Sequence, residues 1–145
     1  FIVLHTYGSH FNYRERYPAE AAFFQPDSPA DAEFKYRDNL INAYDNSIRY
    51  TDDFLSRLIG LLQQQDAGSA MLYTSDHGED IFDDHRRLFL HASPVPSYYQ
   101  LHVPSGLRTH IGRSILSIWT LYRRIVTNLL LRTGWCSIRC SIWPG

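Results

Sequence analysis

Two short apolar runs, one on each side of a long helical pattern, constrain this sequence more than any other feature. Residues 1–4 and residues 70–74 are apolar on both faces, which favours strands buried in a parallel sheet. Between them, from about residue 31 to residue 65, apolar side chains recur at alternating steps of three and four, which predicts one helix with a single apolar face. That face consists of Ile41, Tyr44, Ile48, Thr51, Leu55, Leu58 and Leu62.

The order strand, helix, strand predicts an α/β fold containing a parallel-sheet βαβ unit with a long crossover helix. Each predicted strand ends in polar residues: His5 and His10 follow the first, and Asp76 and His77 follow the second. In open parallel sheets, ligands bind beyond the carboxyl ends of the strands. We therefore expect the two polar clusters to open onto the same edge of the sheet.

Composition excludes several classes of protein. The 145 residues suffice for one domain, and the net charge of −1 argues against a nucleic-acid-binding or polybasic surface. No uncharged apolar stretch is long enough to span a membrane, which takes roughly 18 residues or more. Two cysteines cannot form a disulfide scaffold for a chain of this size.

The charges are unevenly distributed along the chain. All 15 acidic residues lie between Glu15 and Asp84, whereas the residues after Pro104 include six arginines and no Asp, Glu or Lys. We therefore divide the chain into a body, residues 1–104, and an aberrant tail, residues 105–145. For the tail we expect an out-of-frame or disordered segment; the alternatives are an amphipathic membrane-surface helix around residues 111–131 and a divergent domain end.

The segment Asp76-His77-Gly78-Glu79 is the strongest candidate for metal chemistry. Mixed oxygen and nitrogen donors suit Zn²⁺ or Mn²⁺ better than Mg²⁺. Neighbouring side chains on an extended chain point in different directions. Asp76 and His77 could therefore both bind metal only if the chain turns between them or if the site holds two metal ions. An isolated Asp–His pair is also common as surface decoration or as a helix cap, and spacing alone does not decide between these readings.

Seven short motifs, in this order, resemble those of the bacterial phosphoethanolamine transferases, which belong to the alkaline phosphatase/sulfatase superfamily. The resemblance covers residues 1–104, about the C-terminal half of the catalytic domain in that family. The motifs are Leu4-His5-Thr6-Tyr7-Gly8-Ser9-His10, Arg16-Tyr17-Pro18, Asn42-Ala43-Tyr44-Asp45-Asn46-Ser47-Ile48, Tyr50-Thr51-Asp52, Ser75-Asp76-His77-Gly78-Glu79, Leu90-His91 and Leu101-His102-Val103-Pro104.

The resemblance implies a partial alkaline-phosphatase-like (sulfatase) fold in a periplasmic catalytic domain of an inner-membrane enzyme. Such enzymes move phosphoethanolamine from phosphatidylethanolamine to lipid A or to core sugars of lipopolysaccharide. They use a threonine nucleophile and zinc, so we expect one or two zinc ions, with manganese as the alternative. No nucleic-acid partner is expected.

The resemblance also implies roles for individual residues. Asp76 and His77 match zinc ligands, while His10 and His91 match catalytic positions at the phosphoryl group or at a second zinc ion. His5 and His102 match recurrent positions and are given supporting roles. A further set in the helix, Asn42, Tyr44, Asp45 and Asn46, is expected to tie the helix to the loop beneath the site.

The family's threonine nucleophile, one acidic zinc ligand and the membrane helices match no residue here, and we expect them upstream of residue 1. A chain without the nucleophile cannot form the covalent intermediate, so this polypeptide is expected to be inactive alone. Two alternatives stand beside the transferase: a sulfatase or phosphatase of the same superfamily, and a truncated remnant that is no enzyme.

Overall fold

The computed structural model describes residues 1–111 and 114–118, and its dominant element is one long helix. Helix α1 spans Arg37–Gln63, 27 residues, and a 3₁₀ turn at Phe34–Tyr36 precedes it. The predicted helix is therefore confirmed, although it begins several residues later than expected. It ends just before the segment Asp66-Ala67-Gly68, where glycine and a short polar side chain favour a turn.

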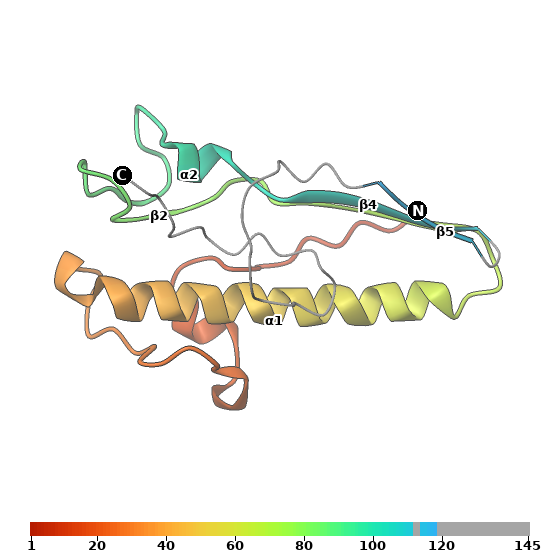
Figure 1. Ribbon diagram of the computed structural model, residues 1–145, viewed down its shortest axis with the longest axis horizontal. Helices are drawn as coiled ribbons and strands as arrows, with labels where there is room; N and C mark the ends of the chain where they lie inside the picture. Colours follow the sequence, from red (N-terminus) through yellow and green to blue (C-terminus); the bar gives the residue numbers. More distant parts are fainter. Residues whose placement is uncertain (112–113, 119–145) are drawn as a thin grey trace.

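A three-stranded antiparallel sheet runs along α1, in the order β1-β4-β5 (Figure 1). The strands are β1 (Ser69–Thr74), β4 (Ser105–Ile111) and β5 (Ser114–Ile118). Strand β4 pairs along the whole of β1, from Ser69 opposite His110 to Thr74 opposite Ser105. A small second sheet pairs β2 (Asp80–Ile81) with β3 (Phe89–Leu90), and the short helix α2 (Tyr98–Leu101) follows.

The α/β class and the strand after the helix are confirmed, whereas the parallel βαβ unit is not confirmed in the described part of the chain. Residues 1–7 form no strand, and residues 1–4 are exposed. The partner of β1 is β4, which runs antiparallel to it. A strand exists only through hydrogen bonds to a neighbouring strand, and no described segment pairs with residues 1–4.

The beginning of the predicted tail is ordered as strands. Residues 105–111 form β4 and residues 114–118 form β5, so the alternative of a helix around residues 111–131 is wrong at residues 114–118. The β4–β5 pairing explains this, because it places Ile111 opposite Ser114 and Leu107 opposite Ile118 in one hairpin. Residues 112–113 and 119–145, with both cysteines and all three tryptophans, lie outside the described residues, and the tail's origin stays a prediction.

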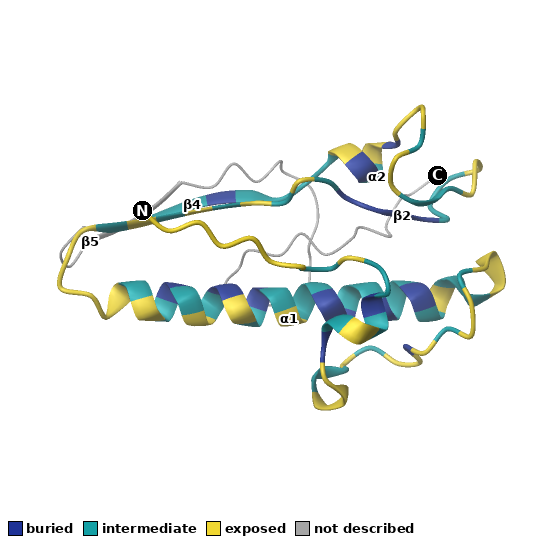
Figure 2. Ribbon diagram, turned by 180° about the vertical axis from the view of Figure 1, so that it is seen from behind, coloured by how far each residue is buried: buried dark blue, intermediate teal, exposed yellow. Residues whose placement is uncertain are grey.

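Within the described residues, the core consists of two clusters on opposite halves of α1. Leu40 and Ala43 pack with Tyr13 and Ile81 near the β2–β3 hairpin. Farther along the helix, Leu55 and Ile59 pack against the underside of β1. Buried residues recur along the length of α1 (Figure 2), because the sheet covers one side of the helix and the loop after residue 13 covers part of the other.

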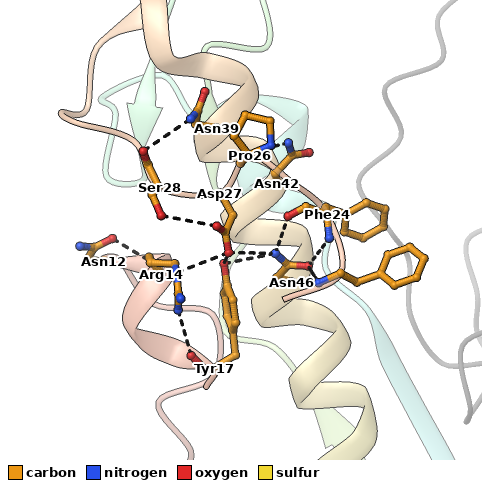
Figure 3. A network of polar contacts seen from close by, with 11 residues as sticks. Asn12, Arg14, Tyr17, Phe24, Pro26, Asp27, Ser28, Asn39, Asn42 and Asn46 are labelled. Atoms are coloured by element: carbon orange, nitrogen blue, oxygen red, sulfur yellow. Dashed lines mark hydrogen bonds and ion pairs between the residues drawn. The ribbon is translucent and has the colours of Figure 1, made fainter. Parts of the chain in front are cut away.

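Covering both sides of the helix buries polar residues as well, and Asn46 is the clearest case (Figure 3). Its Oδ1 accepts hydrogen bonds from the main-chain N–H groups of Phe23 and Phe24, each at 2.9 Å. Its Nδ2 donates to the Phe24 carbonyl at 3.0 Å. Asn42, one turn earlier, donates to the Pro26 carbonyl at 2.9 Å. The expectation that Asn42 and Asn46 tie the helix to the loop is therefore confirmed.

Asn46 also contacts a buried acid, Asp27, through its Nδ2 at 3.4 Å. The Tyr17 hydroxyl donates to Asp27 Oδ2 at 2.7 Å, and Arg14 Nε lies 3.4 Å from the same oxygen. Burial, together with the hydrogen bond to Asp27 and its charge, raises the pKa of Tyr17 to about 12, against the opposing effects of Asn46 and Arg14. We call Arg14, Tyr17, Asp27 and Asn46 the helix–loop network (Figure 3).

Candidate metal centre

The segment from Ser75 to Asp80 leaves the end of β1 and carries the predicted metal-binding motif. Two main-chain hydrogen bonds attach it to the residues around α2: Ser75 N–H donates to Pro104 at 3.2 Å, and Gly78 N–H donates to Gln100 at 2.8 Å. Figure 1 shows α2 beside this segment, between the end of the sheet and the β2–β3 hairpin. The motif is thus held at the polar end of β1, where the sequence placed it.

Gly78 is the residue that allows this close approach. A Cβ atom at this position would overlap the main-chain carbonyl of Tyr99. Main-chain atoms cannot move aside as the end of a flexible side chain can, so any larger residue would push the motif away from α2. The glycine of the Asp-His-Gly-Glu motif is therefore explained by packing, independently of any metal.

Three side chains gather immediately beyond this glycine. His77, Glu79 and His91 each offer one donor atom, and these atoms lie within 4.8 Å of one another. Glu79 Oε1 is 3.0 Å from His91 Nδ1 and 3.9 Å from His77 Nδ1. The two imidazole rings lie 3.8 Å apart between centroids, tilted by 33°. We call these three residues the metal centre.

Glu79 is the buried member of the metal centre, with 5% of its surface exposed. Its second carboxylate oxygen, Oε2, accepts a hydrogen bond from the Tyr13 hydroxyl at 3.2 Å. Tyr13 is fully buried beneath the site and packs edge-on against Tyr44. One oxygen of Glu79 is thus anchored in the core, and the other faces the histidines.

His91 sits on an unusual stretch of backbone. The residues on either side of it, Leu90 and Ala92, both have a φ of 67°. Side-chain-bearing residues rarely adopt this left-handed conformation, which costs on the order of 1 kcal/mol or more per residue. The contact with Glu79, at 3.0 Å, is one interaction that holds His91 in this place.

His10 comes to the same place from the N-terminal segment. Its ring lies 6.5 Å from that of His91, and its Nδ1 is 2.6 Å from the Phe11 carbonyl oxygen. His10 and His91 were both predicted as catalytic, and the structure brings them together. No parallel strand pair is needed for this, because residues 5–10 reach the end of β1 as an irregular segment.

Asp76, predicted as a metal ligand, points toward solvent. Its side chain is 83% exposed, and its Oδ2 lies 3.9 Å from His77 Nε2. The small amount of burial raises its pKa, but hydrogen bonds from main-chain N–H groups and the charges of His77 and His5 outweigh this effect and lower the pKa below its usual value. His5 is therefore close enough to act on Asp76 electrostatically.

His102 is not among the three residues of the metal centre. Its ring stacks on Tyr98 at 4.5 Å, and its main-chain N–H closes helix α2. Sequence reasoning missed Glu79 as a member of the group. The signal available was its place in the Asp-His-Gly-Glu motif, but its burial depends on Tyr13, which lies 66 residues earlier.

The donor set fits a zinc ion. Two imidazole nitrogens and one carboxylate oxygen are the three protein ligands typical of catalytic zinc sites, in which a fourth position stays open. The same set is less suited to magnesium, which prefers oxygen ligands. The roles predicted for Asp76, His10, His5 and His102 stay predictions.

Comparison with known proteins now identifies the family. The chain matches the Sulfatase family over residues 1–115. It belongs to the sulfatase family. Solved structures agree on the fold: the soluble domain of lipooligosaccharide phosphoethanolamine transferase A from Neisseria meningitidis has a TM-score of 0.67 and 34% identity, over 73% of this chain and 33% of that one. The C-terminal periplasmic domain of phosphoethanolamine transferase EptC from Campylobacter jejuni gives 0.65 and 36%, over 70% and 34%.

Curated relatives within the sulfatase family carry related names. The Kdo(2)-lipid A phosphoethanolamine 7''-transferase of Escherichia coli is 41% identical over 93 residues, which are 64% of this chain and 16% of that protein. Phosphoethanolamine transferase EptA of Helicobacter pylori is 38% identical over 95 residues, 64% of this chain and 18% of that protein. The chain thus spans less than a fifth of the length of these relatives. Its described part has no helix both long and apolar enough to cross a membrane.

Proposed function

We propose that this chain is the metal-binding part of a phosphoethanolamine transferase catalytic domain. The full enzyme would take phosphoethanolamine from phosphatidylethanolamine and place it on lipid A or on core sugars of lipopolysaccharide. The observation that carries this proposal is the convergence of His77, Glu79 and His91 within 4.8 Å, in a sulfatase-family chain whose relatives are named for that transfer.

His77, Glu79 and His91 would hold zinc. Bound there, zinc would supply Lewis-acid stabilisation of the charge that develops on the phosphoryl oxygens. In the metal-free chain Glu79 Oε1 contacts His91 Nδ1 at 3.0 Å, and zinc bound to both residues would replace this contact. His10, on the adjoining segment, is the candidate for contact with the phosphoryl group, and Asp76 is the candidate for a further ligand.

We also propose where the whole enzyme works and that the 145-residue chain alone is inactive. The whole enzyme would work in the periplasm, anchored in the inner membrane, as the resemblance implies. The threonine nucleophile of the family matches no position of this chain, so residues 1–145 alone would not transfer phosphoethanolamine.

The test uses the purified 145-residue chain. Calorimetric titration with ZnCl₂ should show saturable binding, and the zinc-loaded chain should then bind phosphoethanolamine more tightly than sulfate. A preference for sulfate would favour a sulfatase instead. Absence of zinc binding, or release of labelled diacylglycerol from fluorescent phosphatidylethanolamine by the chain alone, would contradict the corresponding part of the proposal.

A further inference from the structure

Gln100 forms hydrogen bonds with both neighbours of Glu79 in the sequence, Gly78 and Asp80. The Gln100 carbonyl accepts the hydrogen bond from Gly78 N–H at 2.8 Å. The side-chain amide of the same residue donates to the Asp80 carboxylate. Gln100 is buried, with 5% of its surface exposed, so solvent does not compete for these bonds.

Asp80 is a buried acid whose side chain is held by residues at helix α2. Its side chain is 1% exposed, and its two oxygens are divided between Ser97 Oγ, at 2.7 Å, and the Gln100 amide. Burial of a carboxylate is costly unless it is hydrogen-bonded, and bonds to a charged acceptor are the stronger kind. The position of Asp80 relative to α2 is therefore tightly fixed. Ser97 Oγ also accepts from the Gln100 N–H at 3.2 Å, so the two donors are locked to each other.

Fixing Asp80 fixes Glu79. Neighbouring side chains on an extended segment point to opposite faces. The Asp80 carboxylate bonds to α2 residues, whereas the Glu79 carboxylate bonds to Tyr13 and lies against His91. A shift or rotation of residues 78–80 away from α2 would therefore carry the Glu79 oxygens away from the histidines.

We infer that Gln100 is a positioning residue for the metal centre: by holding Gly78 and Asp80 from helix α2, it sets the placement of the Glu79 carboxylate. Ser97 completes this clamp, which consists of Ser97 and Gln100 on one side and Gly78 and Asp80 on the other. The zinc-related consequence rests on the proposed function, whereas the clamp itself is a property of the metal-free chain.

The test compares Gln100→Leu with the wild-type chain and with Asn46→Ala. Leucine has similar bulk but no amide, so it breaks the bond to Asp80. Asn46→Ala removes a buried amide of the helix–loop network, outside the metal centre and the clamp, and serves as the control for general loss of stability. Ser97→Ala is a milder second variant that keeps the Gln100 side chain and remains informative if Gln100→Leu does not fold.

The first measurement needs no metal. Hydrogen exchange of residues 76–81 in the metal-free chain should be about tenfold faster in Gln100→Leu, less so in Ser97→Ala, and unchanged in Asn46→Ala. The second measurement is zinc affinity by competition with a chromogenic chelator. Removal of an outer-shell partner costs roughly 10–100-fold in metal affinity, so the Kd of Gln100→Leu should rise at least about tenfold, with Asn46→Ala unchanged.

Exchange and zinc affinity in Gln100→Leu that match those of Asn46→Ala would overturn the inference. A wild-type chain that binds no zinc would overturn the proposed function instead. In that case the exchange measurement would still decide whether Gln100 holds residues 76–81.

Discussion

The helix–loop network and the metal centre both bury polar side chains, but they treat those side chains differently. Asn46 is enclosed, and its amide bonds to main-chain groups of the loop and to side chains of the network. Glu79 is also buried, yet one of its oxygens faces the two imidazoles of His77 and His91, which are partly exposed to solvent. A satisfied network stabilises the fold, whereas a cluster of convergent donors is suited to an external ligand.

This difference predicts that changes in the two regions separate stability from metal binding. The largest expected effect is on zinc affinity. His77→Ala or His91→Ala removes a ligand and should weaken zinc binding by about 100-fold or more, since loss of an outer-shell partner alone costs roughly 10–100-fold. Titration calorimetry measures it. His85→Ala, at an exposed histidine outside the metal centre, is the control, and an equal loss there would show that zinc is not bound at the metal centre.

Variants of the helix–loop network are expected to lose stability but to keep their zinc affinity. Asn46→Ala should lower the free energy of unfolding by about 2–4 kcal/mol, because several buried groups lose their partner at once. Urea unfolding followed by fluorescence measures this. Asn42→Ala, which removes only the bond to the Pro26 carbonyl, should cost about 1 kcal/mol. Zinc affinity should not change in either variant; a change would show that the two regions are coupled.

Glu79→Gln tests a residue that bonds both to the core, through Tyr13, and to a histidine of the metal centre, His91. The amide keeps the shape and one acceptor for Tyr13 or His91, but it removes the negative charge that would favour a cation. We expect zinc affinity to fall by about tenfold. Tyr13→Phe, which removes only the core anchor, should lower stability by about 1 kcal/mol and leave zinc affinity within a few-fold of the wild type. If the two variants behaved alike, Glu79 would be a structural residue only.

The smallest effect concerns alkaline pH. Tyr17 stays neutral in the folded chain up to a pKa of about 12, whereas its ordinary value is 10.0. Because the folded pKa is the higher one, the stability contribution is complete below about pH 10 and is lost as the pH rises through about 12. Urea unfolding at a series of pH values should show this loss in the wild type. In Tyr17→Phe the decline over that interval should be shallower.

Local sequence patterns predicted the elements they encode. The apolar period located α1, and the run after it located β1, because both depend on neighbouring residues. The strand partner could not be found in this way, since pairing joins residues far apart, and the unusual composition after Pro104 concealed β4. Residues 1–4 have the composition of a strand, but composition does not provide a partner.

In the metal centre, too, some residues could be predicted from local motifs and others depend on contacts between distant parts of the chain. His77 and His91 were recognisable from motifs. Strand ends were expected to bring His10 near His77, whereas the place of His91 was implied only by the resemblance. Glu79 could not be singled out, because its burial and orientation depend on Tyr13 and on the α2 clamp. The exposure of Asp76 is likewise a tertiary property that no short motif reveals.

Strand β1 forms one border of its sheet: within the described residues it pairs only with β4, and its outward side chains include the exposed Leu72. Main-chain donors and acceptors along an uncovered border can template another strand. At the high protein concentrations used for crystallisation or NMR, two copies are therefore expected to join through β1. NMR spectra recorded at high protein concentration would then report on the β1-paired dimer, and dilution would recover the monomer.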